Sequence, residues 1–180
     1  MTKDVELTTE RLLLRPLRLA DITEILEYSM DDDWSRYFDP STREGVEAFV
    51  AHNVLAPWDK EARFSILLDS RVIGGVGLTI DKGHKIAEIG YSMNKDHWGK
   101  GIMTEAAGRI VRWGFEELGL AKIYSHADVL NVGSWRVMEK VGMTREGLFR
   151  GHSGFRGERQ DDVYYGLLRD EWIANEANLR

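Results

Sequence analysis

Hydrophobic positions along the chain change period several times, and each period predicts one kind of element. Apolar residues recur every three to four positions in some segments, which predicts helices, and alternate with polar residues in others, which predicts strands. The expected elements are, in order, a strand at 11–16, a helix capped by Asp21, a helix from Ser41 or Thr42 to about Val54, strands at 64–68, 72–80 and 86–93, a helix between Gly101 and Gly119, a strand at 122–129, a short helix from Asn131 or Val132 to Gly142, strands at 144–149 and 162–168, and a turn or helix at 170–172.

Turn signals join three of these strands into an antiparallel meander. Asp69-Ser70 and the segment 81–83 are short polar stretches of the kind that close hairpins. The resulting order, β-α-α-β-β-β-α-β-α-β-β, predicts an α/β (α+β) fold with a central, mixed, mostly antiparallel sheet flanked by helices. Residues 31–40 carry neither period and are expected to be irregular. Because the 180 residues hold no internal repeat or linker, we expect a single domain over residues 1–180.

The composition excludes several classes of function. The chain has no cysteine, which excludes a disulfide framework, a thiolate zinc site and a cysteine nucleophile, and which fits a reducing, cytoplasmic location. No apolar run approaches the ~18 residues of a membrane span, and the first residues lack an apolar signal segment, so no membrane partner is expected. The 24 basic and 30 acidic side chains give a net charge of −6, which predicts no direct nucleic-acid partner. Both a monomer and a homodimer remain open.

A glycine-bearing loop, Gly99-Lys100-Gly101, stands directly before the long predicted helix. The first turn of a helix carries unpaired N–H groups and the positive end of the helix dipole, so it attracts phosphate, and glycines let the backbone approach an anion closely. A plain left-handed turn between a strand and a helix is the alternative. The loop is not a Walker loop, because the sequence has no G-x-x-x-x-G-K-[ST] string. It is not a Rossmann motif, because the third glycine is missing and the preceding strands form a meander.

The neighbours of this loop carry a family resemblance. The segments 87–93 (Ala-Glu-Ile-Gly-Tyr-Ser-Met) and 96–106 (Asp-His-Trp-Gly-Lys-Gly-Ile-Met-Thr-Glu-Ala), together with 131–134 (Asn-Val-Gly-Ser) and 139–147, resemble the GNAT acetyltransferase superfamily. The opening segment 7–16 and the closing segment 162–168 are most similar to its branch of ribosomal-protein N-terminal acetyltransferases. The strand and helix order is also that of the GNAT fold.

The resemblance implies acetyl-CoA as co-substrate, with its pyrophosphate held by backbone amides at the start of the long helix. The implied cofactor-binding residues are Tyr91, Met93, Trp98, Gly99, Lys100, Gly101, Ile102, Met103, Thr104 and Asn131. Among these, the Met93 N–H is the expected donor to the thioester carbonyl, and Asn131 is expected to contact the pantetheine arm or, alternatively, only to cap a helix. Trp98 and Met103 depart from the general loop pattern, and Met103 brings a bulky side chain near the phosphates.

Two further residues are candidates for proton transfer. The tyrosine that protonates the leaving thiolate in the family corresponds to Met138, which cannot donate a proton, so Ser134 is expected to replace it. Glu88 is the leading general base for the attacking amine, because an amine must be neutral to attack. Either Glu158 or Asp162 is the alternative base. Glu105, in the first helical turn, is expected to reflect the helix dipole rather than catalysis.

The acceptor is expected to meet an acidic and aromatic rim. The residues that correspond to this region are Asp31, Asp32, Asp33, Trp34, Tyr37 and Phe38, with Trp58 as a further wall. Such a rim suits a cationic or peptide amine, although a charge run is often only solvated. The first expected acceptor is a protein N-terminal amine, such as the alanine of a ribosomal protein, attacked directly in a ternary complex. A small amine (a polyamine, aminoglycoside or amino acid derivative) and a non-catalytic acyl-CoA-binding module are the alternatives.

The five histidines show no metal-ligand spacing, so no metal is expected. Tyr124, His126 and Asp128 alternate along one predicted strand and share a face. A Ser-His-Asp hydrolase would also need a nucleophile beside them on a sharp strand-to-helix turn, and the sequence has no such motif. We therefore predict no hydrolytic triad here.

Overall fold

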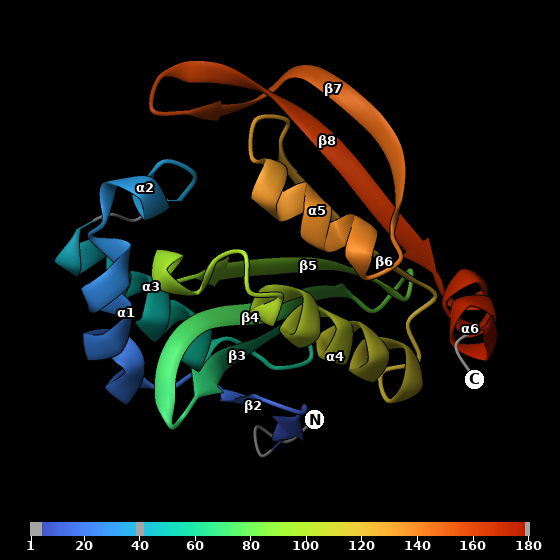
Figure 1. Ribbon diagram of the computed structural model, residues 1–180, viewed down its shortest axis with the longest axis horizontal. Coiled ribbons are helices and arrows are strands. Elements are labelled where there is room, and N and C mark those ends of the chain that lie inside the picture. Colours follow the sequence, from blue (N-terminus) through green and yellow to red (C-terminus); the bar gives the residue numbers. More distant parts are fainter. Residues whose placement is uncertain (1–4, 39–41, 179–180) are drawn as a thin grey trace.

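The computed structural model describes residues 5–38 and 42–178, and its centre is one twisted sheet (Figure 1). Within the described residues the strands are β1 (Leu7–Thr8), β2 (Leu13–Pro16), β3 (Glu61–Leu68), β4 (Arg71–Asp81), β5 (Ile86–Met93), β6 (Lys122–Asp128), β7 (Thr144–Phe155) and β8 (Glu158–Leu168). Their spatial order is β1-β2-β3-β4-β5-β6-β8-β7, and every neighbouring pair is antiparallel except β5 and β6. The predicted mixed, mostly antiparallel sheet is confirmed.

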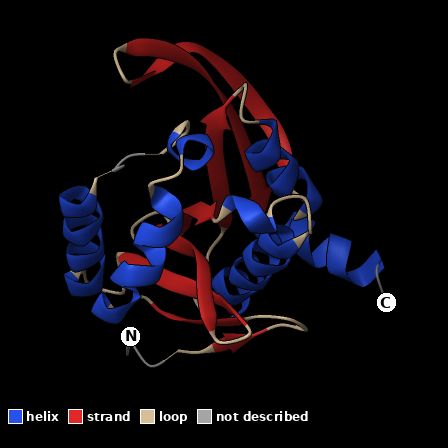
Figure 2. Ribbon diagram, turned by 60° about the vertical axis from the view of Figure 1, so that its left-hand side comes forward, coloured by secondary structure: helices blue, strands red, loops and turns tan. Residues whose placement is uncertain are grey.

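Helices cover both faces of this sheet (Figure 2). The helices are α1 (Ile22–Ser29), α2 (Asp32–Ser35), α3 (Arg43–Leu55), α4 (Ile102–Glu116), α5 (Val132–Lys140) and α6 (Arg169–Asn178), with short 3-10 turns η1 (Leu19–Asp21) and η2 (Lys95–His97). One core packs α4 and α5 against the sheet, and a second, smaller core packs α1, α2 and α3 against β3 and β4. Of the two expected caps of α3, Thr42 accepts a hydrogen bond from the Gly45 N–H, and Ser41 lies outside the described residues.

Two expectations about local structure were wrong. The segment expected to be irregular contains α2, because the Asp31 carboxylate caps its first turn by accepting from the Asp33 N–H. The last two strands extend well beyond 144–149 and 162–168, since pairing resumes after a register shift between Phe149 and Ser153 where the apolar alternation has already ended. Of the turn or helix expected at 170–172, the structure has the helix, which is ten residues long. In Figure 1 the long β7–β8 hairpin arches away from the rest of the sheet.

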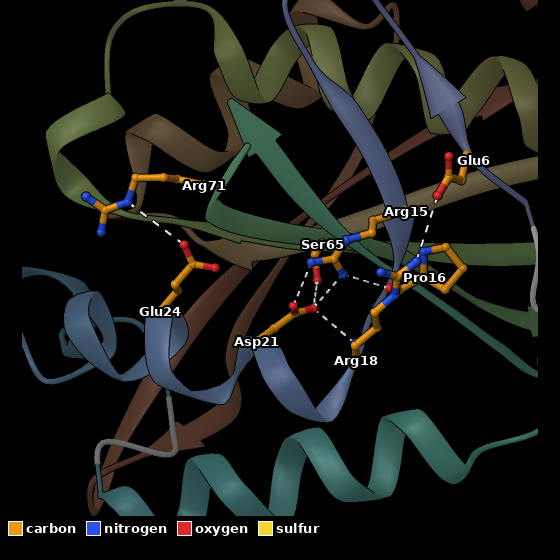
Figure 3. A network of polar contacts seen from close by, with 8 residues as sticks. All are labelled: Glu6, Arg15, Pro16, Arg18, Asp21, Glu24, Ser65 and Arg71. Atoms are coloured by element: carbon orange, nitrogen blue, oxygen red, sulfur yellow. Dashed lines mark hydrogen bonds and ion pairs between the residues drawn. The ribbon is translucent and has the colours of Figure 1, made fainter. Parts of the chain in front are cut away.

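Asp21 precedes α1 as expected, but its side chain does not cap the helix. Its buried carboxylate instead accepts two hydrogen bonds from Arg15 (2.9 and 2.7 Å), one from the Ser65 hydroxyl (2.6 Å) and one from the Arg18 N–H (3.0 Å), as Figure 3 shows. Burial acts to raise the pKa of Asp21, but these hydrogen bonds outweigh it and hold the pKa below its usual value. The network joins β2, β3 and the start of α1.

The parallel strands β5 and β6 pair over only three residues and then separate. The pairs run from Ile86 with Lys122 to Glu88 with Tyr124, and the Ser125 hydroxyl donates to the Ile89 carbonyl at the first step of the separation (2.8 Å). On the other side, the Asn94 N–H donates to Ile73 of β4. Because successive amides of a strand point to opposite sides, the Met93 N–H points away from β4, toward the gap between β5 and β6.

Candidate active site

A cavity of about 450 Å³ opens where β5 and β6 separate, between the start of α4 and helix α5. We call it the cofactor cavity. All the predicted cofactor-binding residues except Lys100 line it, and so does Ser134. The Lys100 ammonium turns back and donates to the Asp96 carbonyl (2.7 Å). The local sequence signals therefore correspond to one continuous surface.

The glycine loop has the geometry of an anion site. Gly99 and Gly101 have φ of 72° and 74°, in the left-handed region that favours glycine. Gly101 occupies the N-cap of α4 without any side-chain cap, so the first helical N–H groups are not satisfied by a cap. The Trp98 indole N–H donates to the Met93 carbonyl (2.9 Å) and ties the loop to β5. The Met103 side chain is buried in the core, so its bulk does not obstruct the loop.

The start of α4 is also fastened to the N-terminal strands. The Glu105 carboxylate accepts hydrogen bonds from the Thr9 hydroxyl, the Arg11 N–H (3.0 Å) and the Arg11 guanidinium (2.7 Å). Partial burial acts to raise the pKa of Glu105, but these donors lower it overall. Arg11 also donates to the Lys100 carbonyl (3.2 Å). Glu105 therefore positions the glycine loop, in addition to lying favourably in the helix dipole.

Two hydroxyl groups meet at the inner end of the cofactor cavity. The Tyr91 hydroxyl donates to the Ser134 carbonyl (2.9 Å), and the Ser134 hydroxyl donates to the Tyr91 oxygen (3.3 Å). Burial raises the pKa of Tyr91 to about 12, so its hydroxyl is protonated at neutral pH. The Asn131 side chain caps α5 by accepting from the Ser134 N–H (3.2 Å). Met138 is buried in the core and has no proton to donate.

A second cavity, of about 300 Å³, lies on the opposite face of the sheet beneath α1, α2 and α3. We call it the acceptor cavity. Its floor includes Gly75, Gly77 and Gly90, and its walls are mostly apolar and aromatic, including Tyr28, Trp34, Phe38 and Phe49. Three residues, Phe38, Tyr91 and Ser92, line both cavities. The two cavities therefore meet at the end of β5.

Glu88 lines the acceptor cavity and belongs to an ionic pair. Its carboxylate lies 3.1 Å from His126 Nε2 and accepts a hydrogen bond from the Tyr124 hydroxyl (3.4 Å). The His126 contact lowers the pKa of Glu88 against the opposing effect of burial, and the same contact raises the pKa of His126. The pairing of β5 with β6 creates this contact, which the alternation of Tyr124 and His126 alone did not reveal.

The alternative bases lie elsewhere. Glu158 begins β8 at the exposed end of the hairpin. Asp162 is buried, with one carboxylate oxygen accepting from Ser153 (3.1 Å) and the other without a hydrogen-bond partner among the described residues. Neither lines the acceptor cavity, whereas Glu88 does.

The residues expected to form the acceptor rim lie in different places. Trp34 and Phe38 stack on each other and line the acceptor cavity, whereas Tyr37 lines the cofactor cavity. Asp31 and Asp33 both contact the Lys95 ammonium (2.6 and 3.4 Å), which neutralises part of the acidic run. The expectation that Trp58 forms a wall of the acceptor groove was wrong, because its ring is buried against Phe64 and Trp113 in the main core.

Sequence reasoning missed several cavity residues. Arg136 and Lys140 lie four residues apart on α5 and line the cofactor cavity, where cations suit a polyanionic ligand. Their spacing after Asn131 was an available signal. Arg63, Tyr28 and Phe49 line the acceptor cavity. Only tertiary structure brings these three to one place.

Within residues 5–38 and 42–178, no cluster of three or more His, Asp or Glu side chains is arranged to hold a metal ion. In the same part of the chain, no helix has the length and apolar character needed to cross a membrane.

Comparison with known proteins gives a consistent family. The family model "Acetyltransferase (GNAT) domain" matches residues 11–144. The chain is 33% identical over 172 residues to "Uncharacterized N-acetyltransferase YnaD" of Bacillus subtilis (strain 168), covering 93% of this chain and 99% of the relative. It is 27% identical to the spermidine N(1)-acetyltransferase of Escherichia coli (strain K12), covering 89% and 88%. A solved acetyltransferase (GNAT family) from Bacillus anthracis superposes with a TM-score of 0.84 at 32% identity, covering 92% of this chain and 99% of that one.

Proposed function

Because this chain belongs to the GNAT family and is an acetyl-CoA-dependent N-acetyltransferase, we propose that it acetylates a small primary amine held in the acceptor cavity. The observation that carries this proposal is the junction of the two cavities at Phe38, Tyr91 and Ser92. A donor in one cavity and an amine in the other would meet at this point. Direct attack in a ternary complex then needs no covalent enzyme intermediate.

The cofactor cavity fits acetyl-CoA. Uncapped amides at Gly101 and the first turn of α4 suit its pyrophosphate, and Arg136 and Lys140 add positive charge along the same surface. When bound, acetyl-CoA supplies the acetyl group as an activated thioester. The Met93 N–H, which points into the gap between β5 and β6, is placed to stabilise negative charge on the thioester carbonyl, as donors in oxyanion holes do.

Proton transfer is assigned to residues on either side of the junction. Glu88 accepts the proton of the acceptor ammonium, since it is the carboxylate that lines the acceptor cavity. Ser134 donates a proton to the leaving sulfur, and the Tyr91 hydroxyl, 3.3 Å away, holds the serine in position. The ionised Glu88–His126 pair makes the base weaker at low pH, so activity should rise as His126 loses its proton.

The size of the acceptor cavity favours a small amine over a protein chain. Its volume of about 300 Å³ lies at the low end of the range for small-molecule sites. The protein N-terminal amine expected from the terminal motifs is the second candidate, supported by the resemblance of segments 7–16 and 162–168 to that branch.

The test is an intact-mass assay of purified protein with acetyl-CoA and a panel of amino acids, polyamines, aminoglycosides and N-terminal peptides. Acetylated small amines are the expected products. Acetylation of peptides alone would replace the small-amine proposal with the protein N-terminal one. Calorimetry with acetyl-CoA is run in parallel, and saturable binding without acetylation of any amine would reject both.

A further inference from the structure

An arginine crosses the glycine floor of the acceptor cavity. In the sheet register, Arg63 of β3 stands opposite Gly77 of β4, which stands opposite Gly90 of β5. A Cβ atom on Gly77 would lie 2.7 Å from the Arg63 Cδ atom and closer still to the Ala62 carbonyl oxygen, so the close approach of the two strands requires glycine here and the Arg63 side chain lies against it. Because Gly90 has open space where its Cβ would stand, the hollow continues beyond the arginine. The absence of side chains on the floor brings Arg63 to the cavity wall.

The Arg63 guanidinium is incompletely paired. Its Nε donates to Asn53 (3.1 Å), one terminal nitrogen, Nη2, donates to Thr79 (2.7 Å), and Glu61 lies 3.6 Å away. The other terminal nitrogen, Nη1, has no hydrogen-bond partner within the described ranges. The side chain is only 23% exposed. Burial lowers the pKa of Arg63 despite the favourable charges of Glu61 and Glu88, as expected for a cation that its neighbours do not fully compensate.

Opposite charges therefore face one apolar cavity. Glu88 lies on the same sheet face as Arg63, one row further along, and both line the cavity. The walls between and above them are aromatic, and the buried Trp34 indole N–H is a further donor without a partner among the described residues. Given the proposed function, we infer that the acceptor is a zwitterionic amino acid with an apolar or aromatic side chain, its carboxylate bound by Arg63 and its amine directed along β5 from Glu88 toward the junction at Ser92.

This inference discriminates between acceptor classes. A carboxylate would accept from the terminal nitrogens of Arg63, so an acceptor without a carboxylate leaves the buried Nη1 without a partner. A polyamine would place a second positive charge beside Arg63. The mostly apolar walls offer few polar partners for the many hydroxyl groups of an aminoglycoside.

The experiment compares three acceptors that differ only at the carboxylate: phenylalanine, phenylalaninamide and phenethylamine. CoA release is measured at saturating acetyl-CoA, products are checked by mass, and binding of the three amines without acetyl-CoA is measured by calorimetry. For the unmodified protein, kcat/KM for phenylalanine is expected to exceed that for the amide by about 10-fold or more. Arg63→Gln should reduce this ratio to about 1, while kcat/KM for the amide stays within about 3-fold of its value for the unmodified protein. Arg63→Lys should retain an intermediate preference for phenylalanine.

Arg71→Gln is the matched control, because Arg71 also pairs with acidic side chains, Glu24 and Glu27, but lines neither cavity. It should keep the unmodified preference. The inference is overturned if kcat/KM of the unmodified protein for the amide or for phenethylamine equals that for phenylalanine, or if only peptides react. It is also overturned if Arg63→Gln lowers kcat/KM equally for all three acceptors. In each of those cases acetyl transfer to an amine still occurs, so the transferase assignment stands apart. If no amine in any class reacts although acetyl-CoA binds, the proposed function fails as well.

Discussion

The cofactor cavity and the acceptor cavity are built from different parts of the chain. The cofactor cavity takes most of its surface from two short segments, 91–104 and 130–140, and its proposed anion site is built mainly on backbone N–H groups. The acceptor cavity takes its surface from β3, β4, β5 and the helices α1 to α3, and its chemistry comes from side chains. A backbone site binds the same anion whatever the side chains, whereas a side-chain site changes its ligand with each substitution. The two cavities therefore differ in whether the backbone or the side chains would select the proposed ligand.

The two cavities also differ in how their helices are anchored. The Arg15–Asp21 pair beside α1 is almost fully buried, whereas the Arg11–Glu105 pair beside α4 is partly exposed. Burial makes the first pair sensitive to the loss of one partner. We expect substitutions in the Arg15–Asp21 pair to lower the free energy of unfolding. Substitutions in the Arg11–Glu105 pair, near the glycine loop, should mainly weaken acetyl-CoA binding.

The largest expected effect is on catalysis in the acceptor cavity. Glu88→Gln should lower kcat by about 100-fold to 10,000-fold at neutral pH, the usual contribution of a general base, and move the pH optimum upward toward the pKa of the amine itself. The Kd for acetyl-CoA should be unchanged, because Glu88 does not line the cofactor cavity. Steady-state kinetics over pH, with calorimetry for binding, measure both. An unaltered pH profile would point to another carboxylate.

His126→Gln serves as the control for this substitution. Because His126 lowers the pKa of Glu88, its removal should let that pKa rise and make Glu88 a stronger base at low pH. The loss of kcat/KM between about pH 8 and pH 6 should then be smaller than in the unmodified protein. A loss as severe as that of Glu88→Gln at all pH values would instead make His126 the base.

The second effect is on stability. Asp21→Asn should lower the free energy of unfolding by about 3 kcal/mol, since it leaves the buried Arg15 guanidinium without its carboxylate. The pKa of Asp21 is lower in the folded state, so its stabilisation is complete above the unfolded pKa near 4 and is lost as pH falls toward the folded value. The free energies of unfolding of Asp21→Asn and of the unmodified protein, measured in urea, should therefore converge in acid. Asp33→Asn, which removes an exposed ion pair with Lys95, should lower the free energy of unfolding by less than about 1 kcal/mol.

The contrast between the cavities explains which site residues could be predicted from the sequence. The glycine loop, the start of α4 and the cap of α5 are local signals, so the cofactor residues could be predicted from the pattern and the family resemblance. Arg63, Gly77 and Glu88 come together only through the register of three strands. That register includes a shift between Ile66 and Leu67, and a shift of one residue moves every side chain to the other face. No local pattern specifies it.

The incorrect predictions have related causes. Trp58 follows a helix and precedes a strand, a position that suits either a groove wall or a core, and packing against Phe64 and Trp113 decides for the core. The outer part of β7 lacks apolar alternation because both of its faces are largely exposed, so pairing with β8 rather than hydrophobicity defines it. Periodicity reports burial, and it does not detect an element that is held by backbone hydrogen bonds.

A smaller effect is expected at the junction of the cavities. Ser134→Ala should lower kcat by about 10-fold to 100-fold, at or below the low end for general acids, because the neighbouring Tyr91 hydroxyl remains. The Kd for acetyl-CoA should change less than kcat. Tyr91→Phe, which keeps the ring and removes the hydroxyl, tests the positioning role. An unchanged kcat at every pH for Ser134→Ala would remove the serine as the proton donor.

The smallest expected effect is confined to the backbone anion site. Gly101→Ala has open space for the new methyl group, whose nearest neighbour is an Arg11 nitrogen at 3.8 Å, so its cost is purely that of a left-handed φ of 74°. That cost is about 1–2 kcal/mol, and if the loop relaxes to avoid it, the Kd for acetyl-CoA should rise about 10-fold while KM for the acceptor stays unchanged. Gly108→Ala, inside α4 with open space around its Cβ, should leave binding unchanged and stabilise the fold slightly. If both variants weaken acetyl-CoA binding equally, the loop conformation is not what holds the anion.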